Sequence, residues 1–275
     1  MDHARRFTAK KIAKRIALIQ GMVHRRTRPV DPFRWTALPD ARTDPPLGAD
    51  ITDWPVLPWN DYWAGQNVHY FMATDFTVPR GWAEGPVALH LPMGVAGDIF
   101  THPEALLYLD GRAYASADRY HHTIYLPDRV RDGHPHRVEL HGWTGLTGWP
   151  PDPKNTDRLK MGTAGLVEMD LPTRDFISLA EVALEHALTL EDSRPAKHVI
   201  LTALDAAFLA LDTRDPMGVA FWASVPTAMR ALRDGLAQAG APIDVTLHAI
   251  GHAHMDIAYL WPVNQIRRKN ARTYS

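Results

Sequence analysis

Three side chains that can bind a metal alternate near the C-terminal end of the sequence, at His252, His254 and Asp256. They follow the apolar run 243–250, which predicts a short buried strand. If the strand conformation continues, all three side chains point to one face, because successive side chains in a strand alternate. Imidazole and carboxylate are suitable Zn²⁺ ligands, and the chain has no cysteine to supply a thiolate. The pattern predicts a metal site, with hydrogen-bonded histidines in a core or a polar cap on a barrel strand as the alternatives.

The spacing alone does not identify the type of hydrolase, because several metal-dependent hydrolases place a His-x-His pair after a first barrel strand. A strand, a polar cluster and a helix-like stretch from residue 262 onward form the first unit of an α/β architecture. A single parallel strand cannot bury both of its faces. We therefore expect these residues to be the N-terminal part of a longer protein; pairing of the strand with an unidentified partner is the alternative.

Other candidate sites are weaker. His134 and His136 have the same spacing but lie in a Gly/Pro turn without a carboxylate at a suitable spacing, so we interpret them as part of a hairpin loop. His121 and His122 are predicted to be structural residues at a strand edge. Three basic residues of the last helix are interpreted as a solvated helix face: Arg267, Arg268 and Lys269. Four tryptophans are interpreted as anchors of an extended chain: Trp54, Trp59, Trp63 and Trp82.

The composition is that of an ordinary globular protein, with 275 residues, 45% of them hydrophobic, and a net charge of −1. This balance gives no reason to expect nucleic acid as a partner. No apolar run approaches the roughly 20 residues of a membrane span, and no signal-peptide pattern is present. We expect a cytoplasmic protein that binds no membrane.

Residues 1–28 carry a local charge of +8, from nine Lys/Arg and one Asp. Ile12, Ile16 and Ile19 recur at helical spacing among the basic residues, which predicts a basic amphipathic helix. We expect it to dock on an acidic surface of the same protein; membrane contact and a transit peptide are the alternatives.

The chain as a whole predicts a multi-domain α+β fold, with an antiparallel β-sandwich, a helical linker and the first strand of a truncated, barrel-like α/β catalytic domain. The expected divisions are a basic helix over 1–28, a Pro/Trp-rich wrap over 29–66, the sandwich over 67–172, the linker over 173–240 and the catalytic start over 241–275.

Local patterns predict the elements inside these divisions. Alternating apolar residues and turn signals indicate strands at 68–77, 86–91, 105–109, 122–126 and 136–142. Asp110-Gly111 after an apolar run predicts a hairpin. Apolar periodicity indicates helices at 175–190 with Asp175 as N-cap, at 196–212, and at 226–239 with Pro226 near the first position.

The C-terminal run GHAHMDIAYLWPVNQIRRKNARTYS (251–275) resembles the opening motif of the catalytic domain of glycoside hydrolase family 38, the retaining, metal-dependent α-mannosidases. Further segments look like the N-terminal β domain of the cytosolic and bacterial branch of that family: TDFTVP (74–79), PEALLYLDGRAYASADRYHHTIYL (103–126) and HRVELHGWTG (136–145). The resemblance covers most of the chain.

The resemblance implies that His254 and Asp256 are two ligands of a Zn²⁺ ion, with Co²⁺ as an alternative metal, and that His252 is not a ligand. Tyr259 stands where the family usually has a tryptophan that stacks on the sugar. The nucleophilic aspartate, which also binds zinc, the remaining ligand and the carboxylic acid that protonates the leaving group are expected beyond residue 275. No catalytic residue is therefore expected in this chain, and the fragment alone is predicted to be inactive.

The implied substrate is an α-mannoside oligosaccharide, cleaved at terminal mannosidic bonds, and the implied assembly is a possible homo-oligomer. Two alternatives remain at this point. One is a non-catalytic carbohydrate-binding β-sandwich, and the other is an amidohydrolase-type metal enzyme in which His252 and His254 both bind the metal.

Overall fold

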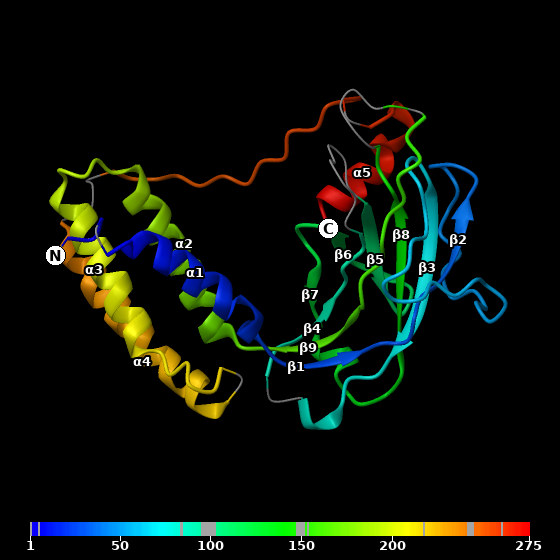
Figure 1. Cartoon of the computed structure of the whole chain (residues 1–275). Helices are drawn as coiled ribbons and strands as arrows, with labels where there is room; N and C mark the ends of the chain where they lie inside the picture. The colour runs from blue at the N-terminus through cyan, green and yellow to red at the C-terminus, as the bar shows by residue number, and fades with distance from the viewer. Residues whose placement is uncertain are drawn as a thin grey trace. The chain divides into compact units, whose positions relative to one another are not determined.

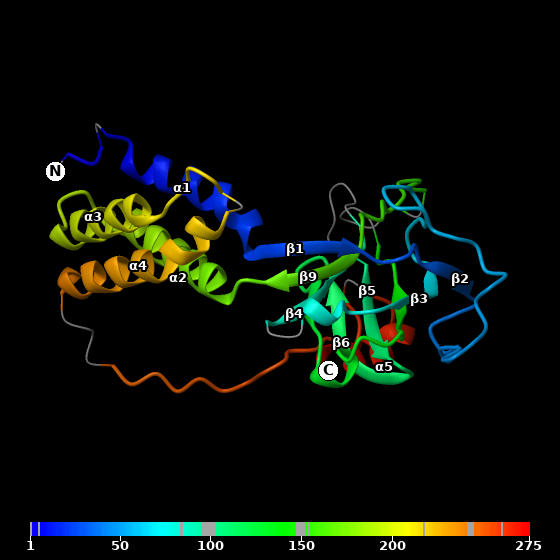
Figure 2. The same ribbon diagram turned by 90° about the horizontal axis from the view of Figure 1, so that it is seen from below.

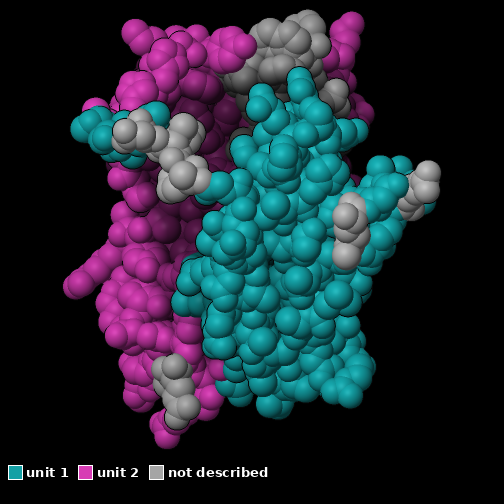
Figure 3. All heavy atoms as spheres, turned by 90° about the vertical axis from the view of Figure 1, so that its left-hand side faces the viewer, with its two compact units in different colours: residues 1–26, 169–249 teal, residues 27–168, 250–275 magenta. Residues whose placement is uncertain are grey.

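The computed structural model describes residues 2–4, 6–82, 85–94, 103–146, 152, 154–216, 218–240, 245–259 and 261–275. The chain divides into two compact units, which Figure 3 colours separately. The helical unit comprises residues 1–26 and 169–249, and the β unit comprises residues 27–168 and 250–275.

The helical unit contains four helices: α1 (Thr8–Ile19), α2 (Leu171–Thr189), α3 (Pro195–Ala210) and α4 (Val219–Leu236). The prediction that the N-terminal helix docks within the same protein is confirmed, because α1 packs on α2 and α3 (Figure 2). The surface it meets is mainly apolar, since Ile12, Ile16 and Ile19 are buried in the core of this unit. One buried carboxylate, Asp205 of α3, adds ion pairs with Arg6 at 3.3 Å and Arg15 at 3.4 Å.

Two predicted helix starts are wrong. α2 begins earlier than expected, because Asp170 rather than Asp175 is the N-cap: its carboxylate accepts a hydrogen bond from the Thr173 amide at 2.9 Å. α4 begins at Val219, so Pro226 lies inside the helix rather than near its first position. A proline inside a helix loses one backbone hydrogen bond. Here Phe221, Val225 and other apolar residues on the same helix bury enough surface to keep it intact.

The β unit contains two sheets with strand orders β1-β9-β4-β7 and β2-β3-β8-β5-β6, and every strand pair with a described register is antiparallel (Figure 1). The strands are β1 (His24–Pro29), β2 (Arg34–Leu38), β3 (His69–Phe76), β4 (Val87–His90), β5 (Glu104–Leu109), β6 (Arg112–Asp118), β7 (Thr123–Tyr125), β8 (His136–Trp143) and β9 (Gly165–Met169). The five predicted strands correspond to β3, β4, β5, β7 and β8. The other four were not predicted.

The apolar core of the β unit draws side chains from both sheets, as an antiparallel sandwich requires. Leu89 of β4 and Leu166 of β9 share one core with Met72 of β3, Leu107 of β5 and Leu140 of β8. On β3, β5 and β8, the residues that alternate with these core residues face outward. That outer face is covered in part by Ile51 and Trp54 from the loop after β2, which pack on Phe71.

The predicted Asp110-Gly111 hairpin is confirmed. These two residues join β5 to β6 and have φ angles of 52° and 73°. Positive φ at both positions is the requirement of a type I′ turn, whose twist matches that of the flanking strands.

The C-terminal region differs from the prediction of a buried strand over 243–250. Residues 241–244 lie outside the described residues, and 245–250 form an extended segment that pairs with no strand in the described part of the chain (Figure 1). Leu247 is 89% exposed and Ile250 is 86% exposed. The physical reason is that an isolated parallel-type strand has no neighbours to satisfy its backbone or cover its apolar side chains. A barrel-like start is therefore not seen.

Candidate functional site

The His-x-His-x-Asp motif lies in the extended segment that precedes the last helix. Nε2 of His254 and Oδ1 of Asp256 are 3.1 Å apart, and both side chains reach the surface, with exposed fractions of 78% and 43%. The alternation expected from the sequence thus brings these two side chains together, even though the backbone is not part of a sheet. Their nitrogen and oxygen atoms are the donor types that Zn²⁺ accepts.

A third donor is not brought to this pair by the residues that the structure describes, since none of their His, Asp and Glu side chains form a group of three able to hold a metal ion. His252, on an exposed stretch of the same segment, belongs to no such group. The contact between the two donors that do meet is a hydrogen bond between His254 Nε2 and Asp256 Oδ1. Two ligands about 2.0–2.1 Å from a tetrahedral zinc ion would lie at a similar separation, about 3.3 Å.

Tyr259 follows in a short bend and is 60% exposed, so its ring is accessible to solvent. Two residues later, Trp261 is half-buried, and Nζ of Lys269 lies 4.4 Å from the centroid of its ring. This cation–π contact joins the end of the motif to the last helix, α5 (Ile266–Thr273).

A set of side-chain contacts, which we call the α5 contact cluster, holds this helix against the outer face of the five-stranded sheet. Its members are His69, Glu104, Ser116, Gln265, Lys269 and Arg272. Its central residue is Glu104 of β5, whose carboxylate accepts hydrogen bonds from Lys269 Nζ at 3.0 Å and Arg272 Nη2 at 2.8 Å. Gln265, just before the helix, bonds to Nδ1 of His69 at 3.0 Å. The Ser116 hydroxyl of β6 donates to the Arg272 carbonyl.

The interpretation of the basic residues on this helix as a solvated face is wrong for Arg268 and Lys269. Arg268 donates to the Ala41 carbonyl at 3.0 Å and pairs with Asp44 at 2.9 Å. Their side chains are only 20% and 21% exposed. An eight-residue helix is too short to be stable by itself, so these contacts, which no pattern within the helix encodes, determine where it lies.

Burial, aided by arginines of α5, lowers the pKa values of two histidines of the sheet. Burial, together with Arg268 and Arg272, lowers the pKa of His141 from 6.5 to about 4. Burial also lowers the pKa of His69, with Arg272 acting in the same direction and Asp40 against it. Both imidazoles are therefore mainly neutral at pH 7. Neither belongs to a group of three possible metal donors among the described residues.

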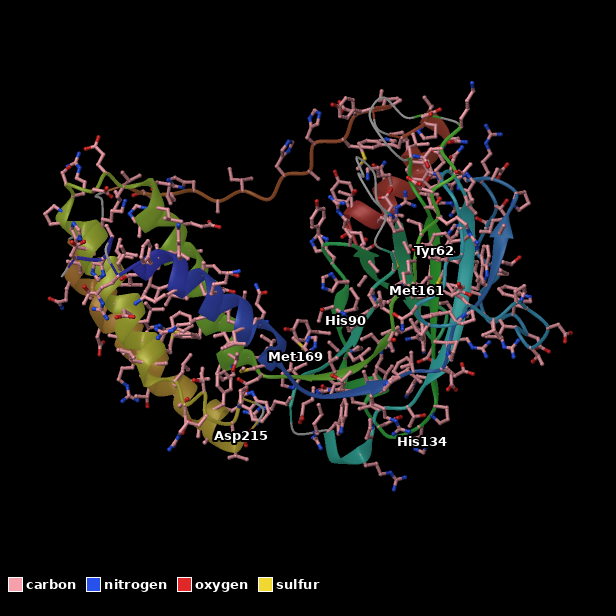
Figure 4. The ribbon with its side chains drawn as sticks, in the orientation of Figure 1. Tyr62, His90, His134, Met161, Met169 and Asp215 are labelled. Carbon is pink, nitrogen blue, oxygen red and sulfur yellow. The ribbon has the colours of Figure 1, made fainter. Side chains whose placement is uncertain are left out.

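The other histidine candidates have structural roles. His136, the first residue of β8, does have carboxylate partners, contrary to the expectation: Nδ1 is 2.9 Å from Asp110 and Nε2 is 3.0 Å from Asp132. Pairing of β5 with β8 brings Asp110 to this strand end, a proximity that sequence spacing does not reveal. His134 lies in the turn before β8, at the end of the β unit away from α5 (Figure 4).

His121 and His122 precede β7 and have contacts within their own turn. His121 Nδ1 lies 3.1 Å from Asp118, and His122 Nδ1 lies 2.9 Å from the Arg119 carbonyl. Both contacts are local, in agreement with the predicted structural role, and the side chain of His121 is itself 72% exposed.

The four tryptophans anchor chain segments, as predicted. Trp63 and Trp82 are buried in the sandwich core, and the Trp63 ring lies edge-on to Tyr70 at 4.9 Å. Trp59 donates to the Val30 carbonyl at 3.2 Å, and Trp54 packs edge-on against Phe71 at 5.9 Å. Their rings are used by the fold rather than offered as a platform.

A comparison with protein families matches residues 244–275 to the model described as "Glycosyl hydrolases family 38 N-terminal domain". The matched stretch contains the donor pair, Tyr259 and α5. The match covers 32 of the 275 residues of the chain. No curated protein sequence matches the chain.

Among solved structures, similarity is found to a calcium-binding mutant of Bacteroides uniformis β-glucuronidase 2, with 13% identity and a TM-score of 0.33 over 52% of this chain and 18% of that one. A β-glucuronidase from Ruminococcus gnavus in complex with D-glucuronic acid is 12% identical, with a TM-score of 0.35 over 52% and 29% of the two chains. The chain thus spans less than a third of the length of either enzyme. At these scores the likeness bears on neither the fold nor the substrate of this chain.

Proposed function

We propose that these residues are the N-terminal part of a cytoplasmic, retaining, zinc-dependent α-mannosidase that removes terminal mannose from oligosaccharides. The observation that carries the proposal is the family match over 244–275, because it falls on the segment that contains the His-x-His-x-Asp motif. A glycosidase of this family needs that motif to bind its metal, and the motif residues are intact in this sequence.

In this proposal His254 and Asp256 hold the zinc ion. Their 3.1 Å separation suits two ligands of one ion, and they are imidazole and carboxylate, which bind zinc without cysteine. Bound zinc would supply a Lewis acid that orients and polarises sugar hydroxyls. The pairing of Asp256 with His254, and not with His252, supports this ligand set over the amidohydrolase alternative, which needs both histidines.

Tyr259 is proposed to stack on the bound sugar. Its ring is 60% exposed, and an aromatic face can cover the apolar C–H groups of a pyranose. A tyrosine at this position keeps the apolar face that the family's usual tryptophan provides and adds a hydroxyl group. The ring is thus suited to hold the sugar beside the metal.

The retaining reaction needs two carboxyl groups, one that attacks the anomeric carbon and one that first protonates the leaving oxygen and then activates water. We propose that both, together with the remaining zinc ligands, come from sequence beyond residue 275. Two donors are fewer than the three or four that hold zinc tightly. The 275-residue chain alone is therefore proposed to be inactive.

The test is a paired assay of chromogenic α-mannoside hydrolysis, with and without added Zn²⁺, by the 275-residue chain and by a version extended along its natural reading frame. We expect turnover only from the extended, metal-loaded protein. In that protein His254→Ala should reduce metal binding more than His252→Ala does. Equal losses would favour the amidohydrolase alternative, and no turnover from a folded, metal-loaded extended protein would refute the proposal.

A further inference from the structure

A pocket of about 550 Å³ lies between α5 and the strands β6 and β7. We call it the α5 pocket; among the residues that line it are Glu104, Ser116, Asp118, Tyr120, Lys269 and Arg272. Its volume is within the range of about 300–1,000 Å³ that small-molecule sites have. None of the residues from His252 to Tyr259 lines it, so it is separate from the donor pair.

The charged side chains on the wall of the α5 pocket balance. Two carboxylates, Glu104 and Asp118, face two cations, Lys269 and Arg272, and both cations are already paired with Glu104. Balanced side-chain charges give the wall no strong preference for an anion or a cation and so suit a neutral ligand.

The polar groups of the wall still have hydrogen-bonding capacity. Each carboxylate oxygen of Glu104 can accept a second hydrogen bond, and the Lys269 ammonium has three N–H donors. Arg272 is only 6% exposed, and its Nε has no hydrogen-bond partner among the described residues. A buried N–H without a partner costs free energy, so a further acceptor, from water or from a ligand, would stabilise this wall.

The other part of the lining is apolar and aromatic. Tyr120 contributes a ring that is 65% exposed, while Ala117 and Ile124 line the pocket from behind with side chains that are buried in the sandwich core. The carboxylate of Asp118 accepts hydrogen bonds from the amides of Tyr120 and His121 at 2.7 and 2.8 Å, and this fixes the turn that carries the ring. The guanidinium carbon of Arg119 lies 4.6 Å from the Tyr120 ring centroid and orients it further.

We propose that the α5 pocket is a second carbohydrate-binding site, which binds a neutral pyranose. A pyranose has hydroxyl groups around its edge and apolar C–H groups on its faces, and so matches a wall that has both kinds of surface. The choice of a sugar as the ligand class rests on the proposed function. The site would hold a sugar residue of the oligosaccharide away from the metal.

The experiment is a titration of methyl α-D-mannopyranoside and α-mannobiose into the full 275-residue chain, followed by NMR, with a chelator present so that the zinc donors take no part. We expect saturable binding that Tyr120→Ala and His121→Ala, the second at another exposed residue of the pocket lining, each weaken about tenfold. The matched controls are Tyr62→Ala and His134→Ala, exposed residues of the same types elsewhere in the β unit, which should change the affinity by less than about twofold.

The outcomes separate this proposal from the proposed function. The proposed sugar site would be refuted by absence of saturable binding. It would also be refuted if the pocket variants and the control variants, all folded, weakened binding equally. Binding that needs zinc and is lost in His254→Ala would refute it too, because such binding would belong to the donor pair. Mannosidase turnover by the extended protein tests the proposed function independently of all these results.

Discussion

The substitution Glu104→Ala tests whether the α5 contact cluster holds the last helix in place. Glu104 is the shared acceptor for Lys269 and Arg272, at 3.0 and 2.8 Å. Its side chain is 13% exposed and that of Arg272 is 6% exposed, so removal of the carboxylate leaves a buried guanidinium without its counter-ion.

The expected cost follows from that burial. Loss of one partner from a buried ion pair typically costs 3–5 kcal/mol, and because Lys269 keeps some access to water we expect about 3 kcal/mol here. A change of this size raises the equilibrium constant for opening by about a hundredfold. Since α5 has only eight residues, its position depends on its contacts with the sheet, among which the two ion pairs of Glu104 are the most buried.

Hydrogen exchange followed by mass spectrometry measures this opening. In Glu104→Ala the amides of residues 262–275 should exchange about a hundredfold faster, while those of β3 and β8 keep their protection. The matched control is Asp44→Asn, which breaks the pair with Arg268 on the same helix but at a carboxylate that is 91% exposed, and it should have little effect. Equal protection of α5 in Glu104→Ala and in the unmodified chain would refute the reasoning.

Three further predictions concern the two units. Asp205→Ala should lower the free energy of unfolding of the helical unit by about 1–2 kcal/mol in chemical denaturation, because the lost partners Arg6 and Arg15 are themselves partly exposed. Gly142→Ala should destabilise the β unit by about 1–3 kcal/mol, since an added Cβ would lie 2.3 Å from the Tyr70 ring, and a denaturation midpoint unchanged from that of the unmodified chain would contradict this. The pKa of His141 is about 4 in the folded state and 6.5 when unfolded, so the unfolded state binds more protons between these values and stability should fall as the pH decreases, by about 2 kcal/mol between pH 7 and pH 5. Denaturation of His141→Gln should show a weaker dependence over that range.

Local patterns predicted those elements whose geometry depends on residues that are close together in the sequence. Asp110-Gly111 specifies its turn through two positive φ angles, and Ile12, Ile16 and Ile19 mark the buried face of α1. β2, in contrast, lies in the Pro/Trp-rich stretch that is predicted to wrap as extended chain. It pairs with β3 at the edge of the sheet, and its other side is joined to the chain near residue 55 by the Arg34–Val56 bridge and a Trp35 N–H to Pro55 carbonyl hydrogen bond of 3.0 Å, so contacts distant in sequence define it.

The site was predictable to a different degree for its donors and for their surroundings. His254 and Asp256 are two residues apart, so the chain itself brings them together whenever it is extended. Glu104 lies more than 160 residues before Lys269 and Arg272 along the chain, and nothing in the spacing of these three residues predicts that they meet. Their contact depends on the position of β5 in a five-stranded sheet, which is a property of the whole fold.

The formation of the donor pair and the attachment of the neighbouring helix α5 therefore depend on different residues. The contact between His254 and Asp256 uses no residue of the sheet, whereas α5 is held by residues of β3, β5 and β6 and by the loop after β2. A substitution at Glu104 should therefore leave the two donors able to meet but loosen the attachment of α5 to the sheet. A substitution at His254 should do the reverse, so that zinc binding by the extended protein is lost while the exchange of α5 amides is unchanged. If both variants lost α5 protection together, the motif and the helix would form one cooperative unit and the separation argued here would be wrong.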